Sequence, residues 1–147
     1  MVYRASKTDI PAIVDMAIRM WEDNTIESLS HEFEEIITNE EAVVFLSMAQ
    51  NQPIGFAQCS LRHDYVEGTD SSPVGYLEGI FVKPEYRRQG HAKELVKKCE
   101  EWAEAMGCSE FASDCELTNH ESLAFHLGMG FTEANRIICF TKRIISS

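Results

Sequence analysis

The most constraining feature of this sequence is an apolar segment that is followed, after a short polar loop, by a long amphipathic segment. Residues 74–82 are rich in β-branched and aromatic side chains and end before Pro84, which is typical of a strand. From about Gln89 the apolar residues follow helical spacing as far as Met106, and Gly107 ends the pattern. A strand, a loop and a covering helix in this order favour a layered α/β fold.

The rest of the chain alternates between the same two kinds of segment, without repeats or linkers. We expect helices over residues 10–21, 29–37, 89–106 and 119–129. We expect strands over residues 2–3, 42–49, 54–63, 74–82 and 110–113, and in two segments through Phe131 and residues 137–141. The order predicts one α/β domain, residues 1–147, with a mixed central sheet of about six to seven strands flanked by about four helices.

The charge of the chain limits its partners. Its 147 residues carry a formal net charge of −11, which argues against nucleic acid or an anionic membrane and favours a cationic partner. No apolar run has the length of a signal segment or a membrane span. The five cysteines are odd in number and form no C-x-x-C pair, so we expect reduced thiols, no zinc site and a cytoplasmic location.

A basic segment interrupts this acidic chain. Residues 83–98 carry six positive and two negative side chains, and the motif Tyr86-Arg87-Arg88-Gln89-Gly90-His91-Ala92 lies where the loop meets the long helix. Glycine permits a tight turn there, and the N–H groups of a first helical turn bind anions. The segment therefore indicates a ligand that carries phosphate. The alternative from these residues alone is a solvated helix start after a simple turn.

This segment resembles the R-x-x-G-x-A pyrophosphate loop of the GCN5-related N-acetyltransferase (GNAT) superfamily, matched by Arg87, Gly90 and Ala92. The preceding strand and a later Asn119, with a helix that ends in Gly128-Met129-Gly130-Phe131, follow in the order of that superfamily. The resemblance covers nearly the whole chain and implies the GNAT fold, with acetyl-coenzyme A as cosubstrate and no metal. It implies cofactor contacts from Ile80, Phe81, Val82, Arg87, Arg88, Gln89, Gly90, His91, Ala92, Lys93 and Asn119. Asn119 equally suits a helix N-cap, and the two roles are compatible.

Three further blocks are similar to bacterial aminoglycoside 6′-N-acetyltransferases. These blocks are Arg62-His63-Asp64-Tyr65-Val66-Glu67-Gly68, Leu77-Glu78-Gly79-Ile80-Phe81-Val82 and Ala112-Ser113-Asp114. The resemblance implies acetylation of the 6′-amino group of these polycationic antibiotics, drug resistance as the outcome, and a homodimer. It implies substrate contacts from Trp21, Asn24, Tyr65, Glu78, Asp114 and Asn135. Some relatives carry His and Glu in place of Asn24 and Asn135, which leaves the range of drugs open, and Trp21 equally suits a core position.

Two residues are candidates for proton transfer. Glu78 is the one carboxylate in an apolar strand, where it can accept the amine proton, directly or through water, or bind the ammonium as a fixed anion. Because carboxylates are weak bases at neutral pH, we favour binding combined with a proton relay. His126 stands where many superfamily members carry a Tyr that protonates the leaving thiolate, although a packed position between two leucines is the alternative. A strand N–H near Ile80 or Phe81 is expected to hold the oxyanion.

Two other functions fit the same residues. The acceptor can be a polyamine or a protein amine, since these are cations too, and the chain can instead be a non-catalytic sensor that binds coenzyme A or a cation. The resemblance of the Tyr65 loop favours an aminoglycoside over other amines. Glu78 and the complete pyrophosphate motif favour catalysis over sensing.

Overall fold

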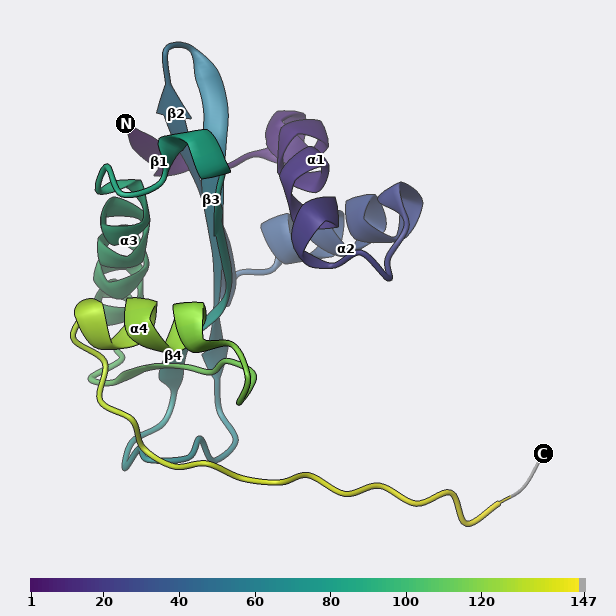
Figure 1. The fold of residues 1–147 in the computed structure, drawn as a ribbon, viewed down its shortest axis with the longest axis vertical. Helices are drawn as coiled ribbons and strands as arrows, with labels where there is room; N and C mark the ends of the chain where they lie inside the picture. Colours follow the sequence, from purple (N-terminus) through teal and green to yellow (C-terminus); the bar gives the residue numbers. More distant parts are fainter. Residues whose placement is uncertain (146–147) are drawn as a thin grey trace. The chain divides into compact units, whose positions relative to one another are not determined.

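The computed structural model describes residues 1–145 (Figure 1). The chain consists of two compact units, Met1–Asp114 and Cys115–Ser147. The first unit contains the strands β1 (Val2–Arg4), β2 (Ala42–Ala49), β3 (Gln52–Arg62), β4 (Val74–Val82) and β5 (Phe111–Ser113). Its α-helices are α1 (Ile10–Met20), α2 (Ile26–Thr38) and α3 (His91–Ala105). The part of the second unit that the structure describes contains α4 (His120–Gly128).

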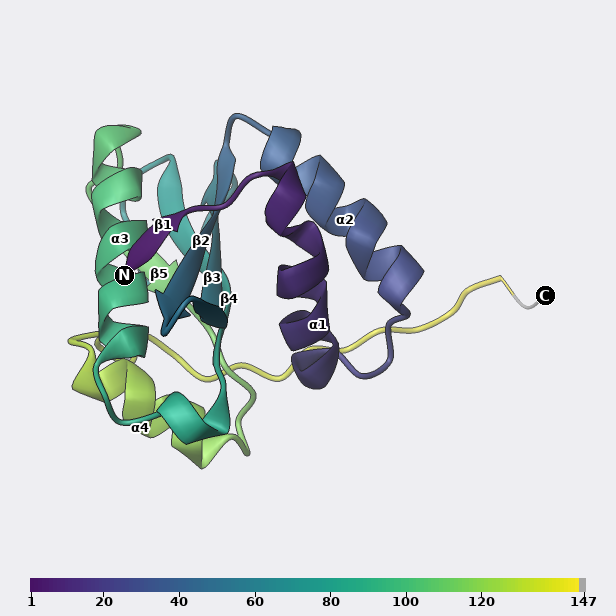
Figure 2. The same cartoon turned by 90° about the horizontal axis from the view of Figure 1, so that it is seen from above.

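The strands form one sheet in the order β1-β2-β3-β4-β5. All neighbours are antiparallel except β4 and β5, which run parallel, so the predicted mixed sheet is confirmed. Helices α1 and α2 cover one face of the sheet and α3 covers the other (Figures 1 and 2). The predicted strand at residues 74–82 matches β4 residue for residue.

Apolar stripes fix these helices to the sheet. On one face, Ile13 of α1 and Phe33 of α2 are fully buried against Phe56 of β3, whose ring lies edge-on to that of Phe33 at 6.0 Å. On the other face, Leu95 and Cys99 of α3 are fully buried. Burial of each large side chain of this kind contributes about 1.5–3 kcal/mol, so packing on both faces stabilises the sheet.

One irregularity in the sheet singles out Glu78. In the β3–β4 ladder, Gln58 pairs with Gly79 and Cys59 pairs with Leu77, which leaves Glu78 as an extra residue on β4. Such a bulge redirects a side chain and interrupts the ladder. On its other side β4 pairs with β5 only over Gly75 to Leu77, so from Glu78 onward β5 pairs none of the N–H and C=O groups of β4.

The two strands predicted through Phe131 and residues 137–141 are wrong for the described chain. Residues 129–145 contain no strand, and the sheet has five strands in residues 1–145 instead of six to seven. The alternating apolar residues produced the prediction, but a strand forms only where a neighbour pairs its backbone groups. In this segment Ile138 and Phe140 are 78% and 87% exposed.

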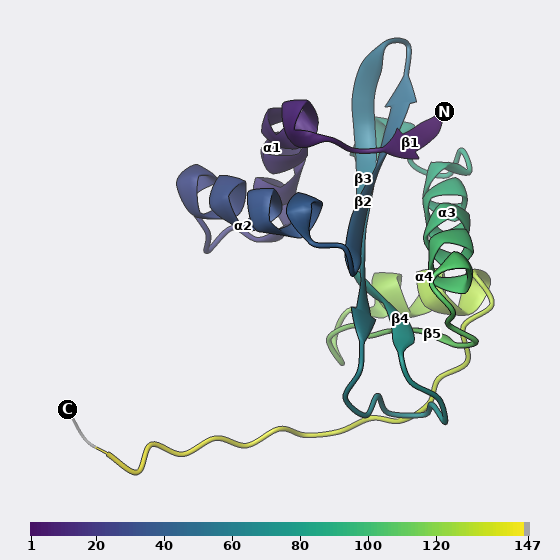
Figure 3. The same cartoon turned by 180° about the vertical axis from the view of Figure 1, so that it is seen from behind.

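Three features of the fold bear on the sequence predictions. The long loop over residues 63–73 lies at the end of β3 and β4 opposite the β2–β3 turn (Figure 3). The five cysteines are free thiols, of which Cys59, Cys99 and Cys108 are buried. None of the helices in residues 1–145 has the length and apolar character needed to cross a bilayer.

Candidate active site

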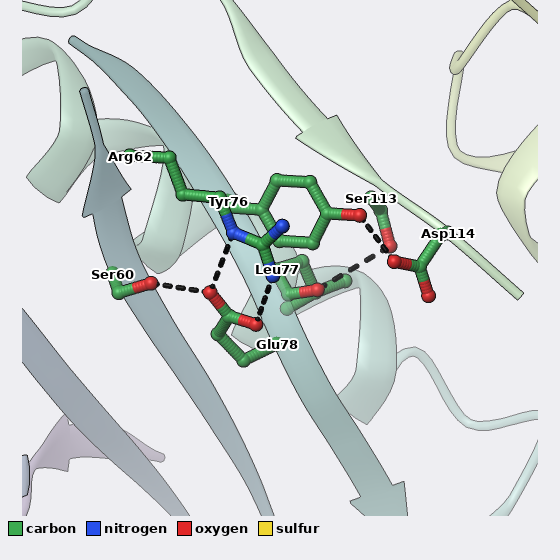
Figure 4. Close-up of polar contacts among 7 residues, drawn as sticks. All are labelled: Ser60, Arg62, Tyr76, Leu77, Glu78, Ser113 and Asp114. Carbon is green, nitrogen blue, oxygen red and sulfur yellow. Dashed lines mark hydrogen bonds and ion pairs between the residues drawn. The ribbon is translucent and has the colours of Figure 1, made fainter. Parts of the chain in front are cut away.

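Glu78 is held by two side chains from the neighbouring strand β3 (Figure 4). Its Oε2 accepts hydrogen bonds from Ser60 Oγ at 2.5 Å and from Arg62 Nε at 3.1 Å. Its Oε1 accepts a hydrogen bond from Arg62 Nη2 at 2.7 Å. The side chain of Glu78 is 23% exposed and that of Arg62 is 42% exposed. The carboxylate is therefore oriented by the protein itself, at the bulge where the edge of β4 opens.

A second carboxylate is connected to the same group of side chains. The Cζ of Arg62 lies 3.4 Å from the centre of the Tyr76 ring, and the Tyr76 hydroxyl donates a hydrogen bond to Asp114. Burial and this hydrogen bond raise the pKa of Tyr76, so its hydroxyl stays protonated at neutral pH and acts as a donor. The hydrogen bonds to Glu78 raise the pKa of Arg62, which keeps its positive charge. The structure thus brings the predicted residues Glu78 and Asp114 into one polar cluster.

The register of the sheet explains this cluster. Ser60 pairs directly with Tyr76, and Arg62 lies two residues further along β3, so these side chains share a face. Asp114 directly follows β5, and Ser113 Oγ donates to the Leu77 carbonyl at 3.5 Å. Ser60, Arg62 and Tyr76 were not among the residues predicted to form the site. Arg62 begins the block of residues 62–68 that resembles known enzymes, and its place in that block was the sequence signal that could have identified it as a site residue.

Tyr65 lies on the loop over residues 63–73 and is 76% exposed. The loop is anchored by Glu110, whose Oε1 accepts hydrogen bonds from Asp70 N at 2.8 Å and Ser71 Oγ at 2.5 Å. These bonds, with that from the Ser71 side chain the largest, lower the pKa of Glu110. The anchoring contributes stability above the ordinary pKa of the carboxyl, and it is lost as the pH falls through the lowered value of the folded protein.

We predict that Glu110→Gln raises the KM of the amine substrate by about threefold or more without a comparable change for acetyl-coenzyme A. Glutamine offers a weaker acceptor than a carboxylate to Asp70 N and Ser71 Oγ, so the Tyr65 loop loses its anchor. Steady-state kinetics with each substrate varied in turn measure the effect, and Glu100→Gln, an exposed carboxylate on α3, is the control. An unchanged amine KM in Glu110→Gln would show that the loop does not contact the amine.

Trp21 follows α1 and packs on β4 beside Glu78. A Cβ built on Gly79 would lie 2.9 Å from two atoms of the Trp21 indole, so only glycine permits this approach. The indole is partly buried and also contacts Phe33 and Phe56, with ring centres 6.4 and 6.3 Å apart. A core role for Trp21 is observed, and its contact with substrate stays a prediction. Asn24 is exposed, and its backbone N–H donates to the Trp21 carbonyl at 3.1 Å.

The predicted phosphate loop makes a tight turn into α3. Arg88 and Gly90 adopt left-handed backbone conformations, with φ of 61° and 86°, and Gly90 is the N-cap of the helix. The first N–H groups of a helix lack partners within it and favour anions. Arg87 Nε donates to the Val82 carbonyl at 2.8 Å, which ties the loop to the end of β4. Residues 83–90 therefore join the open edge of β4 to a basic helix N-terminus.

Three predicted site residues, Asn119, His126 and Asn135, lie in the second unit, whereas the predicted cofactor residues of β4 and of the start of α3 lie in the first. Asn119 caps α4, because its Oδ1 accepts a hydrogen bond from Ser122 N at 3.0 Å. Asn135 Oδ1 accepts one from Arg136 N at 2.7 Å. His126 Nδ1 lies 2.7 Å from the Ser122 carbonyl, and since a carbonyl only accepts, this nitrogen carries the proton. In the neutral ring Nε2 then has no proton to give, so His126 acts as an acid only when its imidazole is charged.

We predict that His126→Ala changes turnover by less than about threefold, because the observed ring contacts are those of a packed residue. The ring lies 5.2 Å from that of Phe131 and bonds to its own helix, so its loss weakens the packing around α4. The measurements are kcat for the amine substrate and the midpoint of thermal unfolding. A fall in kcat of about a hundredfold at unchanged stability would instead assign His126 to protonation of the thiolate.

Within residues 1–145, no group of three or more His, Cys, Asp or Glu side chains is placed to hold a metal ion. Glu78 and the side chains connected to it form one cluster, the Glu78 cluster, which consists of Ser60, Arg62, Tyr76, Glu78 and Asp114. All of these residues lie in the unit formed by residues 1–114. The chemistry that this cluster supports is recognition of a cation and acceptance of its proton.

Known proteins are similar to this chain in both sequence and fold. The profile of the acetyltransferase (GNAT) family matches residues 10–131. An aminoglycoside N(6′)-acetyltransferase type 1 of Acinetobacter baumannii is 43% identical over 126 residues, covering 85% of this chain and 86% of that protein. The enzyme with the same name from Acinetobacter haemolyticus is 36% identical over 140 residues, 95% of this chain and 96% of that protein. The structure of AAC(6′)-Iy, bound to the bisubstrate analogue CoA-S-monomethyl-acetylneamine, is 38% identical with a TM-score of 0.93 and covers 97% of both chains.

Proposed function

The chain belongs to the acetyltransferase (GNAT) family, and from this premise we propose that it transfers an acetyl group from acetyl-coenzyme A to the 6′-amino group of aminoglycoside antibiotics. The observation that carries the proposal is the cluster at the open edge of β4, where Glu78 and Asp114 supply two carboxylates for a polycation. Relatives whose names state this activity match over nearly the whole chain. Drug resistance is the expected physiological outcome.

The reaction forms a C–N bond and breaks the thioester C–S bond. The ammonium first loses a proton to Glu78, directly or through water, and the free amine attacks the thioester carbonyl. A strand N–H near Ile80 or Phe81, on the stretch of β4 that β5 leaves unpaired, stabilises the oxyanion of the tetrahedral intermediate. As the intermediate collapses, its nitrogen loses a second proton to give the amide, and the departing thiolate of coenzyme A takes up a proton. Much of the rate enhancement comes from holding the amine against the thioester.

The loop before α3 supplies the site for the pyrophosphate of acetyl-coenzyme A. The proposal is supported by the positive φ of Gly90, the basic side chains of residues 83–98 and the helix N-terminus that begins at His91. Lys93 and Asn119, which both follow this loop in the sequence, extend the proposed cofactor contacts. The assignments of Arg87, Gly90 and Ala92 follow the R-x-x-G-x-A motif position by position.

We also propose that the chain is one GNAT domain over residues 1–147, works in the cytoplasm and forms a homodimer. The homodimer is supported by the large apolar side chains of Ile137, Ile138, Phe140, Ile144 and Ile145, which are 68–90% exposed. Light scattering at micromolar concentration is expected to give twice the 16.7 kDa mass of the chain. A mass equal to one chain would contradict the homodimer.

The test of the proposed function is release of free thiol from acetyl-coenzyme A by the purified protein. The acceptor panel contains kanamycin, tobramycin, an aminoglycoside with a 6′-hydroxyl, spermidine and a basic peptide. Selective turnover of the 6′-amino drugs is the expected result, and mass spectrometry should locate the acetyl group on that amine. Turnover of spermidine or the peptide alone would change the acceptor but keep the reaction. Failure with every acceptor would favour a non-catalytic sensor.

A further inference from the structure

We propose that Arg62 occupies the place of a substrate ammonium on Glu78 in the free enzyme and is displaced when the cationic substrate binds. This inference rests on the proposed function, which requires Glu78 to face an ammonium group. In the structure both carboxylate oxygens of Glu78 instead face the Arg62 guanidinium, at 3.1 and 2.7 Å. A cation supplied by the protein therefore already satisfies the group that is meant to recognise the substrate (Figure 4).

The surroundings of the guanidinium are those of a general cation site. The site has a carboxylate, Glu78, on one side, and the face of the Tyr76 ring lies 3.4 Å from Arg62 Cζ. A second carboxylate, Asp114, holds the hydroxyl of that ring. Anions and aromatic faces attract an alkylammonium group as they attract a guanidinium. A substrate ammonium that replaces Arg62 thus finds the same partners.

Arg62 is the exchangeable partner of Glu78, whereas Ser60 is the fixed one. Arg62 is the last residue of β3, next to the loop over residues 63–73, and its side chain is 42% exposed. Ser60 lies within the paired part of the strand and donates to Glu78 Oε2 independently of Arg62. When the guanidinium leaves, Ser60 still orients the carboxylate. Because both side chains are partly exposed, water solvates the guanidinium as it leaves, which lowers the cost of the exchange.

Exchange of one cation for another affects selectivity. A substrate must break the Arg62–Glu78 pair before it gains the contact with Glu78, so its apparent affinity is lower than it would be for an empty carboxylate. A substrate with several ammonium groups offsets this cost through contacts with other carboxylates, whereas an amine with a single charge does not. Arg62 is therefore a specificity-determining residue that disfavours simple amines.

The kinetic test compares Arg62→Gln with Arg4→Gln. Both variants lose one positive charge, but Arg4 is exposed on β1, at the opposite edge of the sheet from β5. We expect Arg62→Gln to lower the KM for kanamycin by about fivefold and to lower the KM for a monoamine at least as much. Arg4→Gln should change either KM by less than about twofold, since its charge is screened at physiological salt. A higher kanamycin KM in Arg62→Gln, or one that matches Arg4→Gln, would overturn the proposal.

A second measurement follows the guanidinium itself and does not depend on turnover. The Nε–H signal of Arg62 in a ¹⁵N NMR spectrum, assigned by its absence in Arg62→Gln, should be that of a hydrogen-bonded group in the free protein. Saturating kanamycin, without acetyl-coenzyme A, should shift it to the position and fast solvent exchange of a free arginine. An Nε–H that remains bonded in the complex would overturn displacement. If the drug binds and displaces Arg62 but is never acetylated, the proposed function fails while this inference stands.

Discussion

Replacing Glu78 by glutamine is expected to lower the turnover number for a 6′-amino aminoglycoside by about 10²- to 10⁴-fold. Glutamine has nearly the size of glutamate but neither accepts a proton nor carries the charge that holds an ammonium. Its amide nitrogen also cannot accept the hydrogen bonds that Ser60 and Arg62 donate to the carboxylate. The KM for acetyl-coenzyme A should stay within about twofold, because the basic loop before α3 is untouched.

The pH dependence of this defect separates the two roles of Glu78. If the carboxylate accepts the amine proton, the defect shrinks as the pH rises, because more of the amine is already deprotonated in solution. If the carboxylate only binds the ammonium, the loss appears mainly in the amine KM rather than in kcat. Glu100→Gln, on the exposed face of α3, controls for the loss of one carboxylate. Wild-type turnover in Glu78→Gln would remove this residue from the mechanism.

The parts of the site that could be predicted from the sequence are those determined by local patterns. β4 has the predicted boundaries because its apolar run ends at Pro84, and α3 begins beside Gly90 because glycine tolerates the left-handed turn there. Glu78 was recognisable as the carboxylate within an apolar strand. Each of these signals lies within a few residues of the feature that it predicts.

The parts that could not be predicted depend on contacts between distant segments. The pairing of Arg62 with Glu78 spans 16 residues and requires the register of β3 on β4, including the bulge. The approach of Trp21 to Gly79 depends on how α1 packs on the sheet. The strands predicted near residues 131 and 137–141 had the apolar pattern but no neighbour to pair with in the described chain. A pattern shows that a segment is able to form a strand, whereas pairing requires a partner elsewhere.

Replacing Gly90 by valine is expected to raise the KM for acetyl-coenzyme A by about tenfold or more. Gly90 has φ of 86°, and a β-branched residue in this conformation is strained by about 1–2 kcal/mol or more. A Cβ at this position meets no protein atom within 4 Å, so the protein itself leaves room for a side chain. The expected effect is therefore on the turn and on the approach of a phosphate to the first N–H groups of α3, where each lost charge-assisted bond costs about 1.5–3 kcal/mol.

The other end of the same helix provides the control for strain. Gly107, just beyond α3, has φ of 94°, and a Cβ there also meets nothing within 4 Å. Gly107→Val should therefore lower the thermal stability about as much as Gly90→Val, because both place valine in a left-handed conformation. Only Gly90→Val should weaken acetyl-coenzyme A binding, which isothermal titration calorimetry measures without turnover. Equal loss of binding in both variants would mean that strain in α3, rather than a phosphate site at its N-terminus, accounts for the defect.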